Sequence, residues 1–186
     1  MRETLPPKHP YAKVVVTPAG QIQPQTWLLG SSGQSAAWAG EQGMDYAYAQ
    51  FFTGRQDTGN MDHYRAHLSD GFPGRTLSAV CVSAAPTRQE ALEQSLMAAN
   101  FRVSLGTGRP VTFVTASQMD AETRSLLTSY VLSNEDTILV GDYDEVADKL
   151  TAFQDAHHVD ELMLISYIDN VQTKVEQYRQ LAKRLI

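Results

Sequence analysis

The chain alternates short apolar runs with longer segments whose apolar residues recur every three or four positions. Short apolar runs predict strands, whereas the longer spacing predicts amphipathic helices. The predicted strands lie at 26–29, 46–52, 76–83 and 161–167, and the predicted helices at 35–42, 60–68, 87–102, 142–153 and 171–185. This regular alternation favours a parallel sheet with right-handed crossover connections.

The unit that begins near residue 141 carries the clearest boundary signals. Asp142 stands where a helix N-cap is expected, and Glu145 follows three residues later, as in a capping box. Val146, Leu150 and Phe153 then form one apolar stripe. We therefore expect a helix that starts at Asp142 and packs on the sheet through this stripe.

Two stretches interrupt the alternation. Residues 1–25 are rich in proline and lack a convincing periodic pattern, so we expect an extended lead-in. Residues 106–140 contain a helical piece at 120–132 and a short apolar run at 137–140. We interpret this second stretch as an insertion in a strand-to-strand connection before the last unit. Residues 26–186 then form one α/β domain of about four parallel strands with flanking helices.

Composition and charge narrow the range of partners. The net charge is −6, with acidic and basic side chains interspersed. Nucleic acid or an anionic membrane surface calls for a clustered basic face, so neither is expected. The single cysteine, Cys81, lies in an apolar run and is expected to be buried and structural. No apolar signal core or bilayer-length run is found, which makes the cytoplasm the expected compartment.

The segment after the first predicted strand is the most informative. The apolar run ends at Gly30 and passes through a small polar turn directly into an alanine-rich helix. Ser32 and Ser35 are three residues apart, so both hydroxyls can face one anion beside the unpaired N–H groups of the first helical turn. The same residues also suit a structural role, in which Ser32 caps the helix. The two interpretations are compatible.

Two histidine pairs are weaker candidates. His63 and His67 are four residues apart on a predicted helix, a spacing that can hold a metal ion. No third ligand accompanies them in a recognisable motif, so we expect a solvated helix face and no metal site. His157 and His158 end a predicted helix, where a positive charge interacts favourably with the helix dipole.

Several of these segments together resemble one protein family. The run WLLGSSGQSAAWAGEQG at 27–43, followed by YAYAQFF at 46–52, looks like the luciferase-like flavin monooxygenases. TILVGDYDEVADKL at 137–150 and DELMLISYI at 160–168 are similar to the end of the same family. The resemblance implies a (β/α)8 barrel of the TIM type, of which this chain matches the C-terminal half.

The resemblance also implies a cofactor and its site. Members of the family bind reduced flavin mononucleotide (FMN), and related branches use the deazaflavin F420. Flavin, O2 and a small organic substrate are the implied partners. The flavin phosphate is assigned to the hydroxyls of Ser32 and Ser35 and to the backbone near Ser31 and Gly33. Positions at strand ends that could line the substrate pocket are Gln50, Phe51, Phe52, Ser83 and Tyr167, although loop or core packing explains each of them at least as well.

We therefore expect the C-terminal portion of a flavin-dependent monooxygenase, whose activity depends on a missing N-terminal half. The alternative is a half barrel that binds flavin without oxygen chemistry, or that is purely structural, and that forms a homodimer. An isolated half barrel leaves two sheet edges and one face uncovered. Leu28, Ala47 and Val80 are thus expected to be exposed unless another chain covers them.

Overall fold

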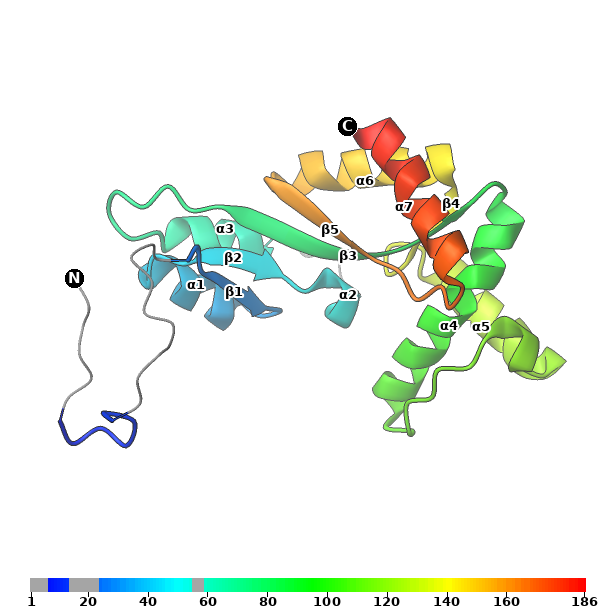
Figure 1. Cartoon of the computed structure of the whole chain (residues 1–186), viewed down its shortest axis with the longest axis horizontal. Coiled ribbons are helices and arrows are strands. Elements are labelled where there is room, and N and C mark those ends of the chain that lie inside the picture. The colour runs from blue at the N-terminus through cyan, green and yellow to red at the C-terminus, as the bar shows by residue number, and fades with distance from the viewer. Residues whose placement is uncertain (1–6, 14–23, 55–58) are drawn as a thin grey trace.

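A computed structural model describes residues 7–13, 24–54 and 59–186 of the chain. Most of the predicted lead-in lies outside these residues, and its described part at 7–13 is a series of turns. The elements follow in the order β1 (Trp27–Gly30), α1 (Gly33–Glu41), β2 (Asp45–Tyr48), α2 (Gln50–Thr53), α3 (Gly59–Ala66), β3 (Thr76–Ala85), α4 (Arg88–Thr107), the 3₁₀ turn η1 (Ala116–Gln118), α5 (Ala121–Ser133), β4 (Leu139–Asp142), α6 (Tyr143–His157), β5 (Glu161–Ile165) and α7 (Val171–Leu185) (Figure 1).

The described strands form one parallel sheet built around β3. β1 pairs with β2, and β2 pairs with the first residues of β3. β5 pairs with β3 over residues 77–81, whereas β4 pairs with its C-terminal part from Val82 to Ala85. All ten residues of β3 are buried, as expected for the central strand. The predicted α/β architecture with parallel strands and flanking helices is confirmed.

Two segments form a different kind of element from the one predicted, whereas the other elements differ from the prediction only in where they begin or end. The apolar run at 137–140, which we assigned to the insertion, leads into β4 because β3 is long enough to pair with a further strand beyond β5. The strand predicted at 46–52 ends at Tyr48, and Gln50–Thr53 forms the short helix α2. This helix ends at Gly54, whose φ of 65° is left-handed and favours glycine.

One face of the sheet is covered by helices. Side chains of β1 and β2 pack under α1 and α3, and those of β3 and β5 pack under α6 and α7. The fully buried side chains of these two clusters include Tyr46, Met61, Tyr64, Val80, Leu150 and Leu181. Val80 and the half-buried Leu28 belong to this covered face, and Ala47, on the opposite face, is only 7% exposed. Our expectation that these three residues would be exposed was therefore wrong. Strand side chains alternate between faces, and Leu28 and Val80 point toward the helices.

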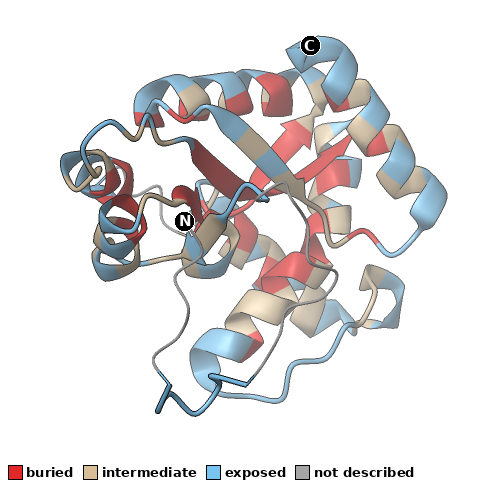
Figure 2. Cartoon of the chain, turned by 60° about the vertical axis from the view of Figure 1, so that its left-hand side comes forward, coloured by how far each residue is buried: buried red, intermediate tan, exposed pale blue. Residues whose placement is uncertain are grey.

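The opposite face forms an open trough of about 590 Å³. Its lining residues are Gln25, Trp27, Leu29, Ala47, Arg75, Leu77, Ala79, Glu161 and Met163. Leu29 is 62% exposed and Met163 is 53% exposed, which is unusual for large apolar side chains on a sheet. Exposed and partly buried residues alternate over the first four positions of β5 (Figure 2). The expected open face therefore exists, with Leu29 and Met163 as its exposed residues.

Helices α4 and α5 close the same face farther along β3. Cys81 and Ala85 pack against Leu96 of α4 and Leu127 of α5 in one buried cluster. Cys81 is 2% exposed, and this burial raises the pKa of its thiol to about 12. The trough is thus open at the N-terminal part of β3 and roofed at its C-terminal part.

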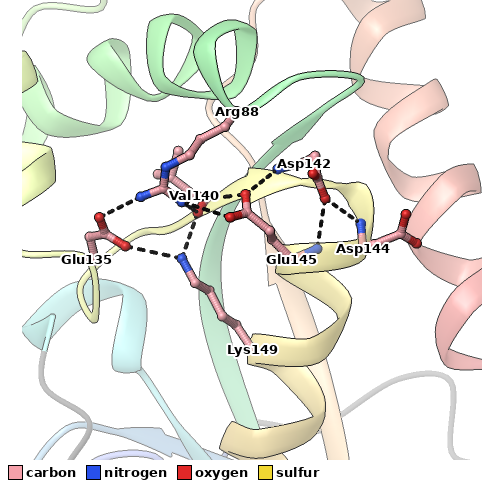
Figure 3. Close-up of polar contacts among 7 residues, drawn as sticks. All are labelled: Arg88, Glu135, Val140, Asp142, Asp144, Glu145 and Lys149. Carbon is pink, nitrogen blue, oxygen red and sulfur yellow. Dashed lines mark hydrogen bonds and ion pairs between the residues drawn. The ribbon is translucent and has the colours of Figure 1, made fainter.

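A network of charged side chains fastens β4 to its surroundings (Figure 3). Arg88 of α4 lies 2.6 Å from one carboxylate oxygen of Glu135, and the Nζ of Lys149 lies 3.2 Å from the other. Lys149 also donates to the carbonyl oxygen of Val140 at 2.8 Å. Burial favours the neutral carboxyl, but the hydrogen bonds from Arg88 and Lys149 outweigh it and lower the pKa of Glu135. The turn before β4 is therefore held from two helices.

Candidate functional site

The turn between β1 and α1 is closed by a reciprocal capping box. The N–H of Ser35 donates to the Oγ of Ser32 at 3.3 Å, and the N–H of Ser32 donates to the Oγ of Ser35 at 3.3 Å. The hydroxyl of Ser35 also donates to the carbonyl oxygen of Ser32 at 2.7 Å. The predicted capping role of Ser32 is therefore confirmed.

Gly30 makes room for this arrangement. A Cβ atom at Gly30 would lie 2.1 Å from the Oγ of Ser35, closer than any real contact. The hydroxyl of Ser35 thus occupies the space beside the end of β1, where it also lies 3.4 Å from the hydroxyl of Tyr46. Any side chain at residue 30 would displace the helix start from the strand end.

The chemistry of this turn suits a phosphate group. The first N–H of the helix with an intrahelical acceptor is that of Ala36, which donates to Ser32 at 3.1 Å. The N–H groups of Gly33 and Gln34 precede it and need an external acceptor. Ser32 is exposed and Ser35 is partly exposed, so an anion can reach both hydroxyls and the positive end of the helix dipole.

Helix α3 brings a histidine to the same turn. A Cβ atom at Gly33 would lie 3.4 Å from the ring of His63, so the imidazole borders the start of α1. The rings of His63 and His67 are 4.3 Å apart between centroids, and His67 uses Nδ1 to contact the carbonyl oxygen of His63 at 2.7 Å. Among the described residues, no cluster of three or more His, Cys, Asp or Glu side chains could hold a metal ion.

The residues that follow β2 divide between anchoring and lining roles. Gln50 is fully buried and its amide donates to the carbonyl oxygen of Asp136 at 3.0 Å, which ties α2 to the segment before β4. Phe51 packs between the cluster under α4 and the trough side chains, and Arg102 donates to its carbonyl oxygen at 2.5 Å. Phe52 is 52% exposed.

Ser83 and Tyr167 lie in different surroundings. Ser83 is buried, and its hydroxyl donates to the carbonyl oxygen of Ala91 at 2.7 Å, so it fastens β3 to α4. Tyr167 follows β5 and lines a pocket of about 200 Å³ formed with α4 and η1. Burial raises the pKa of Tyr167, which keeps the phenol protonated at neutral pH.

An aromatic cluster around Tyr167 was absent from our sequence-based candidates. The ring of Phe101 lies 5.3 Å from that of Tyr167 and 5.8 Å from that of Phe113, which is 62% exposed. Phe113 belongs to the irregular connection after α4, where no apolar period marks it. Only the folded chain brings these rings to the end of β5.

These residues share one edge of the sheet because every strand is parallel. The turn with Ser31 and Ser32 follows β1, the Gln50–Phe52 segment follows β2, and Tyr167 follows β5. Ser83 lies within β3 and is not part of this edge. The carboxyl ends of parallel strands are the usual place for ligand sites in α/β proteins.

Comparison with known proteins gives the following matches. A family model described as luciferase-like monooxygenase matches residues 3–158. The N-acetyl-S-alkylcysteine monooxygenase of Bacillus subtilis (strain 168) is 26% identical over 189 residues, which span 100% of this chain and 57% of that protein. The uncharacterized protein YwcH of the same strain is 28% identical over 182 residues, covering 94% of this chain and 54% of YwcH. The chain thus spans about half the length of the curated relatives it matches.

This chain also covers about half of each of three solved structures that it resembles. Apo-MsnO8 superposes with a TM-score of 0.75 at 28% identity, covering 92% of this chain and 53% of that one. The oxygenating constituent of 3,6-diketocamphane monooxygenase from Pseudomonas putida, solved with FMN, gives 0.55 at 16% identity, covering 87% and 48%. An F420-dependent secondary alcohol dehydrogenase gives 0.59 at 12% identity, covering 89% and 50%. The last two share the fold alone. No helix in the described part of the chain combines the length and apolar character that a bilayer span needs.

Proposed function

The chain belongs to the luciferase-like monooxygenase family, and from this membership we propose that it forms the flavin-phosphate half of a flavin-dependent monooxygenase site. The observation that carries the proposal is the exposed turn at the end of β1, where two serine hydroxyls and the first N–H groups of α1 converge. One relative is named a monooxygenase, and one protein of the same fold was solved with FMN.

In this proposal the phosphate is bound by the backbone N–H groups of Gly33 and Gln34 and by the hydroxyls of Ser32 and Ser35. The backbone at Ser31 completes the turn. These donors carry no net charge, so the helix dipole supplies the electrostatic part of the interaction. The ring of His63 borders Gly33, so in this proposal it lies beside the bound phosphate.

FMN is the cofactor we assign, and F420 is the alternative that the fold comparison leaves open. When bound in reduced form, a flavin supplies the electrons that let O2 oxidise a small organic substrate. The chain's own contribution is to hold the phosphate and to wall the adjoining space with Phe51, Phe52 and Tyr167. Gln50 and Ser83 support the wall from behind, through their bonds to Asp136 and Ala91.

Replacing both serines tests the phosphate assignment. The double variant Ser32→Ala, Ser35→Ala should lose about 1–3 kcal/mol of FMN binding free energy, the usual scale for hydrogen bonds to a charged group. Fluorescence titration measures this loss. Riboflavin, which lacks the phosphate, should bind the variant and the unmodified chain equally well.

A matched control separates binding from helix capping. Thr87 caps α4 with the same capping-box geometry, so Thr87→Ala should cost a similar stability of about 0.5–2 kcal/mol without changing FMN affinity. Unchanged FMN affinity in the double serine variant would contradict the phosphate site. Equal losses for FMN and riboflavin would contradict it as well.

A half barrel that binds flavin without oxygen chemistry is the second candidate. It is favoured by the open trough, which the helices in the described part of the chain leave uncovered. This candidate predicts FMN uptake with no O2 consumption beyond that of free reduced FMN. Substrate-dependent O2 consumption measured with an oxygen electrode would exclude it.

A further inference from the structure

The open trough has side chains in register across four strands. Leu29 pairs with Ala47, Ala47 with Leu77, and Leu77 with Glu161, which makes one row from β1 to β5. The large exposed side chains, Leu29 and Met163, lie on the outer strands. The central strands contribute the small Ala47 and Ala79 together with Leu77, all of which are at most 7% exposed.

Both edges of this four-stranded part are open in the described structure. β1 pairs with β2 alone, over the four residues Trp27–Gly30, and β5 pairs with β3 alone, over the five residues Glu161–Ile165. Each edge therefore presents unpaired backbone N–H and C=O groups. An edge next to an exposed apolar face is a template for pairing with another chain.

We propose that two copies of this chain close one eight-stranded barrel, in which the β5 edge of each copy pairs with the β1 edge of the other. A two-fold axis along the barrel keeps all eight strands parallel and makes the two seams identical. Eight is the number of strands at which side chains just fill the interior. The proposal rests on the fold and is independent of flavin binding.

The sizes of the trough side chains fit a second copy. Side chains fill the interior of such a barrel in layers drawn from alternate strands. In the two-copy ring, β1 alternates with β3 and β2 alternates with β5. The layers drawn from β1 and β3 then combine the large Leu29 with the small Ala79. Those drawn from β2 and β5 combine the large Met163 with the small Ala47. This alternation of large and small side chains lets facing layers interdigitate.

The charged side chains of the trough are compatible with burial between two copies. The charged residues among those that line it are Arg75 and Glu161, and they already pair with each other at 3.2 Å. Closing two troughs against each other therefore brings no unpaired charge into the interior.

The mass in solution tests the proposal first. Light scattering and native mass spectrometry of the full chain should give twice the 20.6 kDa of one copy. Leu29→Glu and Met163→Glu should each convert the dimer to a monomer, because they place charge in the barrel interior. Both side chains are more than half exposed in the single chain, so far-UV circular dichroism should stay unchanged.

Leu126 supplies the matched control. It is 63% exposed on α5, against 62% for Leu29, and it lies outside the trough. Leu126→Glu should therefore leave the dimer intact. A chain that stays monomeric across a concentration series would overturn the proposal. So would a dimer that survives both trough substitutions, or one that only Leu126→Glu dissociates.

Cross-linking tests the seam itself. A mixture of Leu29→Cys and Met163→Cys chains, unfolded together, refolded and oxidised, should yield predominantly the mixed disulfide-linked pair, because a disulfide joins only neighbouring positions such as those across the proposed seam. The native Cys81 is buried and does not compete. Cross-links that join only identical variants would show that the two copies meet in another way and would overturn the edge-to-edge arrangement. FMN is absent from all these assays, so their outcome is separate from that of the phosphate site.

Discussion

At the scale of single residues, the capping box shows how one turn can serve structure and ligand together. Ser32 uses a lone pair of its Oγ to accept from the Ser35 N–H, which leaves its proton with only a 3.4 Å contact to the Ser35 hydroxyl. Ser35 commits its own proton to the carbonyl oxygen of Ser32 at 2.7 Å. Ser32 is therefore the hydroxyl that can turn toward an anion without breaking a short bond.

This asymmetry predicts unequal effects of the two single substitutions. Ser32→Ala should account for most of the FMN affinity lost by the double variant. Ser35→Ala should account for the smaller part, since the Ser35 hydroxyl must give up its 2.7 Å bond to the Ser32 carbonyl oxygen before it can donate to the phosphate. Titration of each variant with FMN and with riboflavin measures the difference. A larger loss from Ser35→Ala would mean that the phosphate rearranges the capping box.

At the scale of elements, β4 shows how a short strand depends on its surroundings. It has four residues and pairs with only the last part of β3. The capping box of Asp142 and Glu145 starts α6 directly at its end, with the Glu145 N–H donating to Asp142 at 2.9 Å. The charged network around Glu135 holds the chain before it. Side-chain contacts at both ends thus fix a strand that pairing alone would support weakly.

Glu135→Gln should weaken this attachment in a pH-dependent manner. The folded-state pKa of Glu135 lies below its ordinary value of 4.5, so its stabilisation is present above that pH and is lost as the pH falls through the folded-state pKa. Because the pair is partly exposed, we expect a loss of about 1 kcal/mol or less in the free energy of unfolding at pH 7. The difference between variant and unmodified chain should shrink below about pH 4.5.

Urea unfolding at pH 7 and at acidic pH measures this effect. Asp148→Asn on α6 is the control, since Asp148 is exposed and has no ion pair among the described residues. It should change stability little at either pH. A Glu135→Gln effect that persists unchanged in acid would mean that packing, and not the charge network, stabilises β4.

At the scale of the whole molecule, the sheet is covered unequally. Helices bury one face along its full length, whereas the other is roofed by α4 and α5 only over the C-terminal part of β3. The remaining trough and both open edges belong to the same four strands. The molecule as a single chain therefore leaves its least protected backbone where the proposed seams lie.

Hydrogen exchange should show this inequality. Amides of β3, buried along all ten residues, should exchange slowly in every assembly state. Amides at 27–30 and 161–165 should be protected in the proposed dimer and should exchange faster in the monomeric Leu29→Glu variant. Mass spectrometry of peptides from both forms makes the comparison. Equal exchange of these two edges in dimer and monomer would place the dimer contact elsewhere.

The local features of this protein were predictable from the sequence. The helix that starts at Asp142 and the cap at Ser32 depend on residues within one turn of each other. Apart from α2 and β4, the strands and helices follow in the predicted order. The apolar run around Cys81 predicted its burial. The family was recognisable from the order and spacing of its motifs, and the family model confirms it. Local patterns sufficed because caps and apolar periods are properties of neighbouring residues.

Other features were decided only by tertiary structure. The β4 pairing and the α2 turn depend on contacts between segments far apart in the chain, such as Gln50 with Asp136. The face of Leu28 and Val80 was predicted wrongly because an apolar run on a strand does not show which of its alternating side chains meets the helices. The aromatic cluster at Tyr167 joins three elements with no shared sequence pattern. The sequence by itself determined most of the elements and their order, with β4 and α2 as the exceptions, because most of them depend on short-range interactions. Which surfaces meet was decided only in the folded chain, where long-range packing selects among faces that are locally equivalent.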